Sequence, residues 1–138
     1  MVNLNIDTGV VEYRLNDNFS AWLNPTDPAF VSRLYGRFFE LEERDKAWRE
    51  KIGKLEGAAV LDAWEEGDTM FRSAIDDVLG EGCCRAVAGS ASVLAMAGGS
   101  PIWMNILLAI IDAMDSAVAR EQKAVNPKLQ KYLAKYHK

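Results

Sequence analysis

The sequence predicts a small, mainly α-helical domain with a helical hairpin and a short N-terminal β-hairpin. Apolar residues recur at heptad spacing through residues 28–79, and residues 3–15 alternate between apolar and polar side chains. The chain has 138 residues, enough for one domain with its own core, and 49% of them are apolar. We therefore expect a single helical domain over 1–122, followed by a basic C-terminal helix or tail over 123–138.

The N-terminal β-hairpin is expected over residues 3–15, with its turn at residues 7–9 (DTG). Leu4 and Ile6 alternate with polar residues before this turn, and residues 10–15 alternate again after it. Residues 16–18 (NDN) break the strand pattern, and the apolar patch that follows is expected to form one helical turn. Two strands alone are barely stable, so the hairpin must pack on the helices or on the edge of a partner.

Two long helices are expected over 28–52 and 57–79, folded back on each other as an antiparallel hairpin. Thr26 or Asp27 is suited to cap the first helix, and Pro28 is suited to its first turn. Glycines interrupt the pattern between the helices and end the second one. The apolar seams of the two helices consist of Leu34, Phe38, Leu41, Trp48, Ile52 and Leu55, and of Leu61, Trp64, Phe71, Ile75 and Val78.

Each seam contains one acidic exception, Asp45 in the first helix and Asp68 in the second. A turn near 56–57 would place these two carboxylates level with each other, where buried like charges would repel. We expect this end of the hairpin to project into solvent, with Arg44, Arg49 or Arg72 close to the carboxylates. No histidine, lysine or nucleophile is placed to complete a two-carboxylate catalytic site.

The second half contains a short helix over 83–88 and a long apolar helix that begins after Ser100-Pro101 and extends to about residue 122. Residues 86–111 carry no charge, so a membrane span is an alternative interpretation. Glycines, serines and Pro101 interrupt that stretch, however, and its strongly apolar part, residues 102–111, is too short to cross a bilayer. This pattern favours a buried core helix.

Composition and charge argue against several functions. The first 119 residues are strongly acidic and would repel nucleic acid, whereas six of the chain's sixteen basic residues lie in 120–138. Cys83 and Cys84 are neighbours in sequence, which favours free, packed thiols in a reducing compartment. His137 is the only histidine. The sequence contains no recognisable catalytic triad, nucleotide-binding loop or set of metal ligands. We therefore expect no enzyme activity, cofactor or metal.

Four stretches resemble, in their order along the chain, the small tail assembly chaperones of long-tailed phages and prophages of Gram-positive bacteria. They are LNIDTGVVEYRLND, NPTDPAFVSRLYGRFFELEE, IDDVLGEG and GGSPIWMNILLAIIDAMD, and they span most of residues 3–115. The resemblance implies a mostly helical, non-enzymatic protein of the host bacterial cytoplasm. Such chaperones bind the tape measure protein and keep it soluble until tail tube subunits polymerise around it. Many of their genes also produce a longer, frameshifted product that recruits the tube subunit.

A chaperone of this kind needs an apolar groove or helix face that accepts a helical partner. The candidate contact residues are Trp103, Met104, Leu107, Ile110 and Ile111 on the last long helix, and Phe38, Phe39 and Trp48 on the first. A stripe of this kind is also typical of a core, and this alternative stays open. Self-association through the heptad seams is a second hypothesis. A tail component retained in the virion is the alternative function, and a small holin-like membrane protein is a further one.

Overall fold

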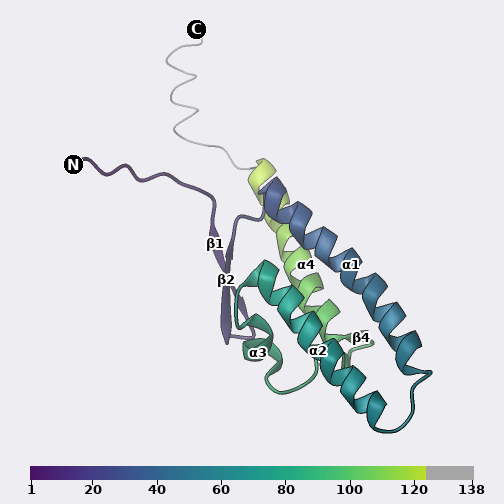
Figure 1. Ribbon diagram of the computed structural model, residues 1–138. Helices are drawn as coiled ribbons and strands as arrows, with labels where there is room; N and C mark the ends of the chain where they lie inside the picture. The colour runs from purple at the N-terminus through teal and green to yellow at the C-terminus, as the bar shows by residue number, and fades with distance from the viewer. Residues whose placement is uncertain (124–138) are drawn as a thin grey trace.

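The computed structural model describes residues 1–123, and the predicted basic helix or tail lies outside this range apart from its first residue. The elements in chain order are β1 (Val11–Leu15), β2 (Phe19–Leu23), α1 (Pro28–Ile52), α2 (Ala58–Leu79), α3 (Cys83–Ala88), β3 (Met96–Ala97), β4 (Ser100–Pro101) and α4 (Ile102–Lys123). Figure 1 shows α1, α2 and α4 aligned along a common direction, with the β1–β2 hairpin and α3 beside them. The predicted mainly α-helical class is confirmed.

The helical hairpin lies where the heptad pattern predicts it. The side chain of Asp27 accepts a hydrogen bond of 3.0 Å from the backbone nitrogen of Ala29, and Pro28 occupies the first helical position. Gly57 and Gly80 flank α2 with φ angles of 64° and 130°, conformations that L side chains rarely adopt. Most seam residues are buried or half-buried, but Leu61 is 68% exposed.

The β-hairpin forms from different residues than predicted. β1 pairs antiparallel with β2, from Val11 opposite Leu23 to Leu15 opposite Phe19, and residues 1–10 form no strand. The turn is residues 16–18, where Asn16 and Asp17 have φ angles of 52° and 59°. The expected 3–15 hairpin and the expected helical turn after residue 18 are therefore wrong, because the chain reverses at the second polar cluster and not at the first.

The inner face of this hairpin packs on the helices. Ala21 and Leu23 are 1% and 5% exposed, and β2 contacts α3. Below the sheet, one core contains side chains from α1, α2 and α4 together with the linker that follows α3. Its largest fully buried members are Trp103, Phe71, Leu34, Leu41, Ile75 and Leu107.

The linker after α3 also starts α4. The backbone nitrogens of Ile102 and Trp103 donate to the carbonyl oxygens of Ala95 and Val93 at 2.8 and 2.9 Å. These bonds satisfy helix N-terminal donors that would otherwise lack partners. The helix begins after Ser100-Pro101, as expected, but these two residues form the short strand β4.

Candidate partner-binding surface

The N-terminal end of α4 packs against the middle of α1 through Trp103. This side chain has no exposed surface, and its ring lies 5.9 Å from that of Phe38 and 5.6 Å from that of Phe71. Its indole nitrogen donates a hydrogen bond of 2.7 Å to the Oδ2 atom of Asp45. Trp103 is therefore a core residue whose single polar atom is satisfied inside the protein.

Asp45 and Asp68 each have their own hydrogen-bond donors. Asp45 is 7% exposed and accepts hydrogen bonds from Trp103 and from Nε of Arg49. Asp68 pairs with Arg72 at 3.1 Å and accepts a hydrogen bond of 2.8 Å from the backbone nitrogen of Val93. The expected arginine partners are thus correct for Arg49 and Arg72. The turn between the helices is largely exposed, as expected, but Asp45 does not share this exposure, because it is buried among donors from α1 and α4.

Both arginines also hold the linker between α3 and α4. Nη2 of Arg49 donates to the carbonyl oxygen of Leu94 at 2.9 Å, and Nη2 of Arg72 donates to those of Gly89, at 2.9 Å, and Ala91. Two aspartate–arginine pairs, one on α1 and one on α2, therefore position the segment that leads into α4. Charged groups that are paired and hydrogen-bonded in this way meet the requirement for burial.

The structure divides the predicted contact residues into two groups. Trp103, Leu107 and Ile110 are at most 2% exposed, so they belong to the core and not to the surface. The other five have accessible surface. Phe39 is 58% exposed, and the half-buried residues are Phe38, Trp48, Met104 and Ile111.

Trp48 lies on the side of α1 that packs against α2. Its Nε1 atom donates a hydrogen bond of 2.9 Å to the carbonyl oxygen of Ala63, and Nζ of Lys51 lies 4.8 Å from the ring centroid. These contacts hold the ring against α2. Trp48 therefore does not share a surface with Met104.

An open groove lies where α1, the β3–β4 turn and the start of α4 meet, with a volume of about 520 Å³. Met96 and Met104 provide apolar side chains with accessible surface, and four charged residues of α1 line it, namely Glu42, Asp45, Lys46 and Arg49. Met96 is 59% exposed. Methionine side chains adapt easily to different apolar partners.

Further apolar side chains with accessible surface lie beyond the groove on α1 and α4, which run antiparallel (Figure 1). Phe39 lies one turn before Glu42 on α1, and Leu108 lies one turn after Met104 on α4, so both are displaced in the same direction. Leu108 is 37% exposed. We name Phe39, Met96, Met104, Leu108 and Ile111 the α1–α4 surface. Sequence reasoning missed two of its members. Leu108 follows Met104 at helical spacing and was detectable, whereas nothing local marks Met96.

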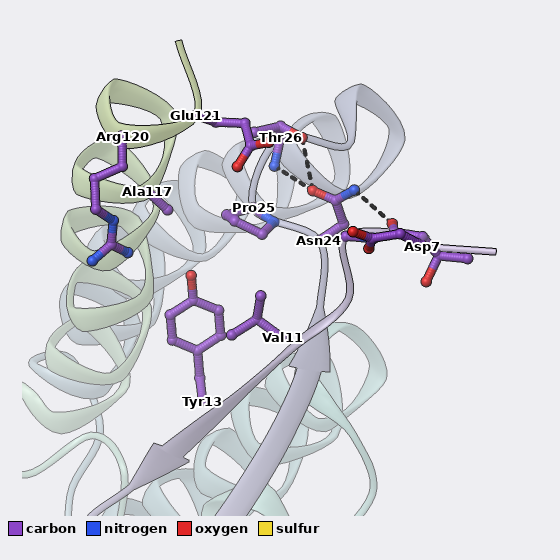
Figure 2. Close-up of a pocket in the computed structure, with 11 residues that line it drawn as sticks. Asp7, Val11, Tyr13, Asn24, Pro25, Thr26, Ala117, Arg120 and Glu121 are labelled. Atoms are coloured by element: carbon purple, nitrogen blue, oxygen red, sulfur yellow. Dashed lines mark hydrogen bonds between the residues drawn. The ribbon is translucent and has the colours of Figure 1, made fainter. Parts of the chain in front are cut away.

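A second hollow lies between the β-hairpin and the end of α4, and its volume is about 430 Å³. Figure 2 shows Val11 and Tyr13 of β1 on one side of it and Ala117 and Arg120 of α4 on another. The side chain of Asn24 closes its rim, because it donates to the carbonyl oxygen of Thr8 at 2.9 Å and accepts from Thr26. These bonds fix the point where residues 1–10 leave the domain.

A third hollow, of about 500 Å³, separates the tip of the β-hairpin from α3 and α4. Aliphatic side chains such as Leu15, Ile102 and Ile106 line it, together with three alanines and the polar residues Arg14, Asn16 and Asn105. Within residues 1–123, no group of three or more histidine, cysteine or acidic side chains is placed to hold a metal ion.

Cys83 and Cys84 are fully buried free thiols, as the sequence predicts. Burial, and to a smaller extent the charge of Asp76, raises the pKa of Cys83 to about 12. The same two causes also raise the pKa of Cys84. The carboxylate of Asp76 accepts hydrogen bonds from the backbone nitrogens of Gly82 and Cys84, so it caps α3 from the end of α2. Both thiols therefore stay protonated and enclosed.

α4 is long and apolar enough to cross a membrane by length and composition. Core helices meet the same test, and six residues of α4 are buried in this fold, including Trp103 and Ile106. A comparison of the chain with protein-family models, with curated proteins and with solved structures found no match.

Proposed function

We propose that this protein is a tail assembly chaperone of a long-tailed phage or prophage and binds the tape measure protein in the host cytoplasm. The observation that carries the proposal is the α1–α4 surface, an open apolar strip on a chain whose stretches resemble such chaperones. It is a binding function that needs no catalytic residue and no cofactor.

The shape and chemistry of this strip suit an amphipathic helix. Met104, Leu108 and Ile111 lie at positions i, i+4 and i+7 of α4, the spacing with which helices contact each other. Phe39 and Met96 add exposed apolar area at its edges, and charged side chains of α1 border it. A long helical rod with apolar stripes aggregates unless such stripes are covered. A reversible, methionine-rich surface would cover one of them.

The core residues of the predicted set have a supporting role in this proposal. Trp103 and Leu107 hold α4 in place, and they contact no partner while the domain keeps this fold. We therefore expect Phe39, Met96 and Leu108 to contribute most of the contacts with the partner. These three side chains are exposed enough to be changed without leaving a cavity in the core.

Co-expression with the tape measure protein of the same phage or prophage tests the proposal. We expect the soluble fraction of the tape measure protein to rise and the two proteins to co-purify. Phe39→Asp combined with Leu108→Asp is expected to abolish both effects while the circular dichroism spectrum stays unchanged. Leu61→Asp is the matched control, because Leu61 is 68% exposed on α2 and does not line the groove. Unchanged solubility of the tape measure protein with the wild-type chain would refute the function.

A structural tail component is the alternative, and purified virions distinguish it. A chaperone is absent from finished particles, whereas a connector or completion protein is retained in them. A partner other than the tape measure protein, such as the tail tube protein, would co-purify in the same experiment and would identify itself by mass spectrometry.

A further inference from the structure

The first six residues form an extended arm whose apolar side chains are largely exposed. Val2, Leu4 and Ile6 are 85%, 76% and 78% exposed, and they alternate with Asn3 and Asn5. An extended chain places these two sets on opposite faces. The arm thus has the pattern of a half-buried strand, but within residues 1–123 no second strand pairs with it.

The base of this arm is fixed to the domain, and the arm points away from it. The carbonyl oxygen of Thr8 accepts a hydrogen bond from Asn24, and the backbone nitrogen of Gly9 donates to Asp7. Gly9 has a φ angle of 72°, a conformation common at bulges and turns. Figure 1 shows the arm running away from the helices beyond this point.

β1 has a free edge with which the arm can pair. It pairs with β2 along one edge, and no strand of the described part of the chain occupies its other edge. A free edge of this kind presents unpaired backbone donors and acceptors to another strand. Val11, at the start of β1, is 45% exposed.

The arm and β1 are complementary in one antiparallel register. Placing Ile6 opposite Val11 also places Leu4 opposite Tyr13 and Val2 opposite Leu15. The same register sets polar residues against polar ones, with Asn5 opposite Glu12 and Asn3 opposite Arg14. The five residues 2–6 then cover all five residues of β1, so apolar side chains meet on the face that packs on the helices.

We propose that two copies of this chain exchange their N-terminal arms, each arm pairing with β1 of the other copy. Within one chain, residues 2–6 could pair with β1 in this register only if residues 7–10 formed a tight reverse turn. In the structure the bonds at Thr8 and Gly9 direct it outward instead. In a two-fold symmetric dimer each arm pairs with the free β1 edge of the other copy. No arm or β1 edge is then left over, so the assembly stops at two copies.

This inference does not depend on the proposed function, because it is measured on the purified chain alone. Two five-residue arms bury less than the roughly 1,200 Å² that is usual for tight complexes, so we expect a concentration-dependent dimer. Sedimentation velocity over a range of concentrations should show it. A chain that is monomeric at every concentration would overturn the inference.

Charged substitutions locate the interface. Leu4→Lys with Ile6→Lys removes the apolar contacts and should weaken dimerisation by more than about tenfold. Asn3→Lys with Asn5→Lys adds the same charge on the opposite face of the arm and serves as the matched control, with dimerisation retained. If the two variants dissociate equally, or if neither does, the arm is not the interface.

A disulfide distinguishes exchange from folding back within one chain. Directly opposite residues of an antiparallel pair have Cβ atoms about 4.5–5.5 Å apart, close enough for a disulfide after a small adjustment. Ile6→Cys with Val11→Cys, treated with a mild oxidant, should give a dimer-sized band on a non-reducing gel. A monomer-sized species with the bond inside one chain, or no bond at all, would overturn the exchange. The wild-type chain is the control for Cys83 and Cys84, which are buried.

Discussion

The indole nitrogen of Trp103 donates a hydrogen bond of 2.7 Å to the carboxylate of Asp45, 58 residues earlier in the chain. Asp45 occupies a seam position of α1 and is 7% exposed, and Arg49 provides its second donor. Because Arg49 also donates to the carbonyl oxygen of Leu94, this carboxylate connects α1, α4 and the linker between α3 and α4. The start of α4, next to the α1–α4 surface, is therefore held by a polar network within the core.

Removal of this carboxylate should destabilise the domain. Asp45→Ala leaves the buried indole N–H of Trp103 and the Arg49 guanidinium without their acceptor, which is expected to lower the free energy of unfolding by about 2–4 kcal/mol. Urea denaturation measures this change. Asp77→Ala is the control, because its carboxylate is exposed and pairs with Arg37 at the surface; its effect should stay below about 1 kcal/mol. Equal effects of the two substitutions would contradict the role assigned to Asp45.

Periodicity predicts the helices of this protein well and its long-range polar contacts poorly. The expected bounds 28–52 and 57–79 agree closely with α1 and α2, because heptad spacing, Pro28 and the flanking glycines act locally. The burial of Asp45 depends on a donor 58 residues away, which no local pattern records. The same limit explains why the sequence pattern places Trp103 and Met104 in one candidate set, since helical spacing alone does not distinguish the core face of α4 from its surface edge.

The predicted β-hairpin failed for a different reason. Both residues 7–9 and residues 16–18 contain turn-forming side chains, and alternation continues across the first of them. The choice between them depends on which strands bury an apolar face. β2 places Ala21 and Leu23 in the core, whereas Leu4 and Ile6 are 76% and 78% exposed.

Two glycines in the helical hairpin should respond in opposite directions to alanine. A Cβ atom at Gly67 would lie 2.6 Å from Nε1 of Trp48 and 2.9 Å from Cδ1 of Leu94, so Gly67→Ala should destabilise the domain by about 1–3 kcal/mol. At Gly36 a Cβ atom has no neighbour within 4 Å, and Gly36→Ala should stabilise by about 0.5–1 kcal/mol. Thermal unfolding of both variants tests this. Stabilisation by Gly67→Ala would show that α1 and α2 pack less closely.

The buried thiols predict a loss of stability in alkaline solution. Burial raises the pKa of Cys83 to about 12, whereas the unfolded chain loses this proton near its ordinary value of 9.0. The contribution of each thiol to stability is thus complete below pH 9 and decreases as pH rises towards 12, by at most about 1.4 kcal/mol per pH unit. Urea denaturation at several pH values should show a steeper alkaline decline for the wild-type chain than for Cys83→Ala with Cys84→Ala. Parallel pH profiles would mean that the thiolates form equally well in the folded state.

The observed hairpin turn makes a prediction that the 3–15 hairpin does not. The backbone nitrogen of Asn18 donates to the carbonyl oxygen of Leu15 at 3.0 Å, and both residues between them have positive φ angles. This combination is typical of a type I′ turn, for which Asn-Gly is the preferred pair. Asp17→Gly should therefore stabilise the domain by up to about 1 kcal/mol, because glycine adopts the φ angle of 59° without a Cβ clash. Thr8→Gly is the control and should give no such gain, because the turn that the sequence predicts at residues 7–9 is absent from the structure. The melting temperatures of both variants test this. A larger increase for Thr8→Gly than for Asp17→Gly would favour the 3–15 hairpin in solution.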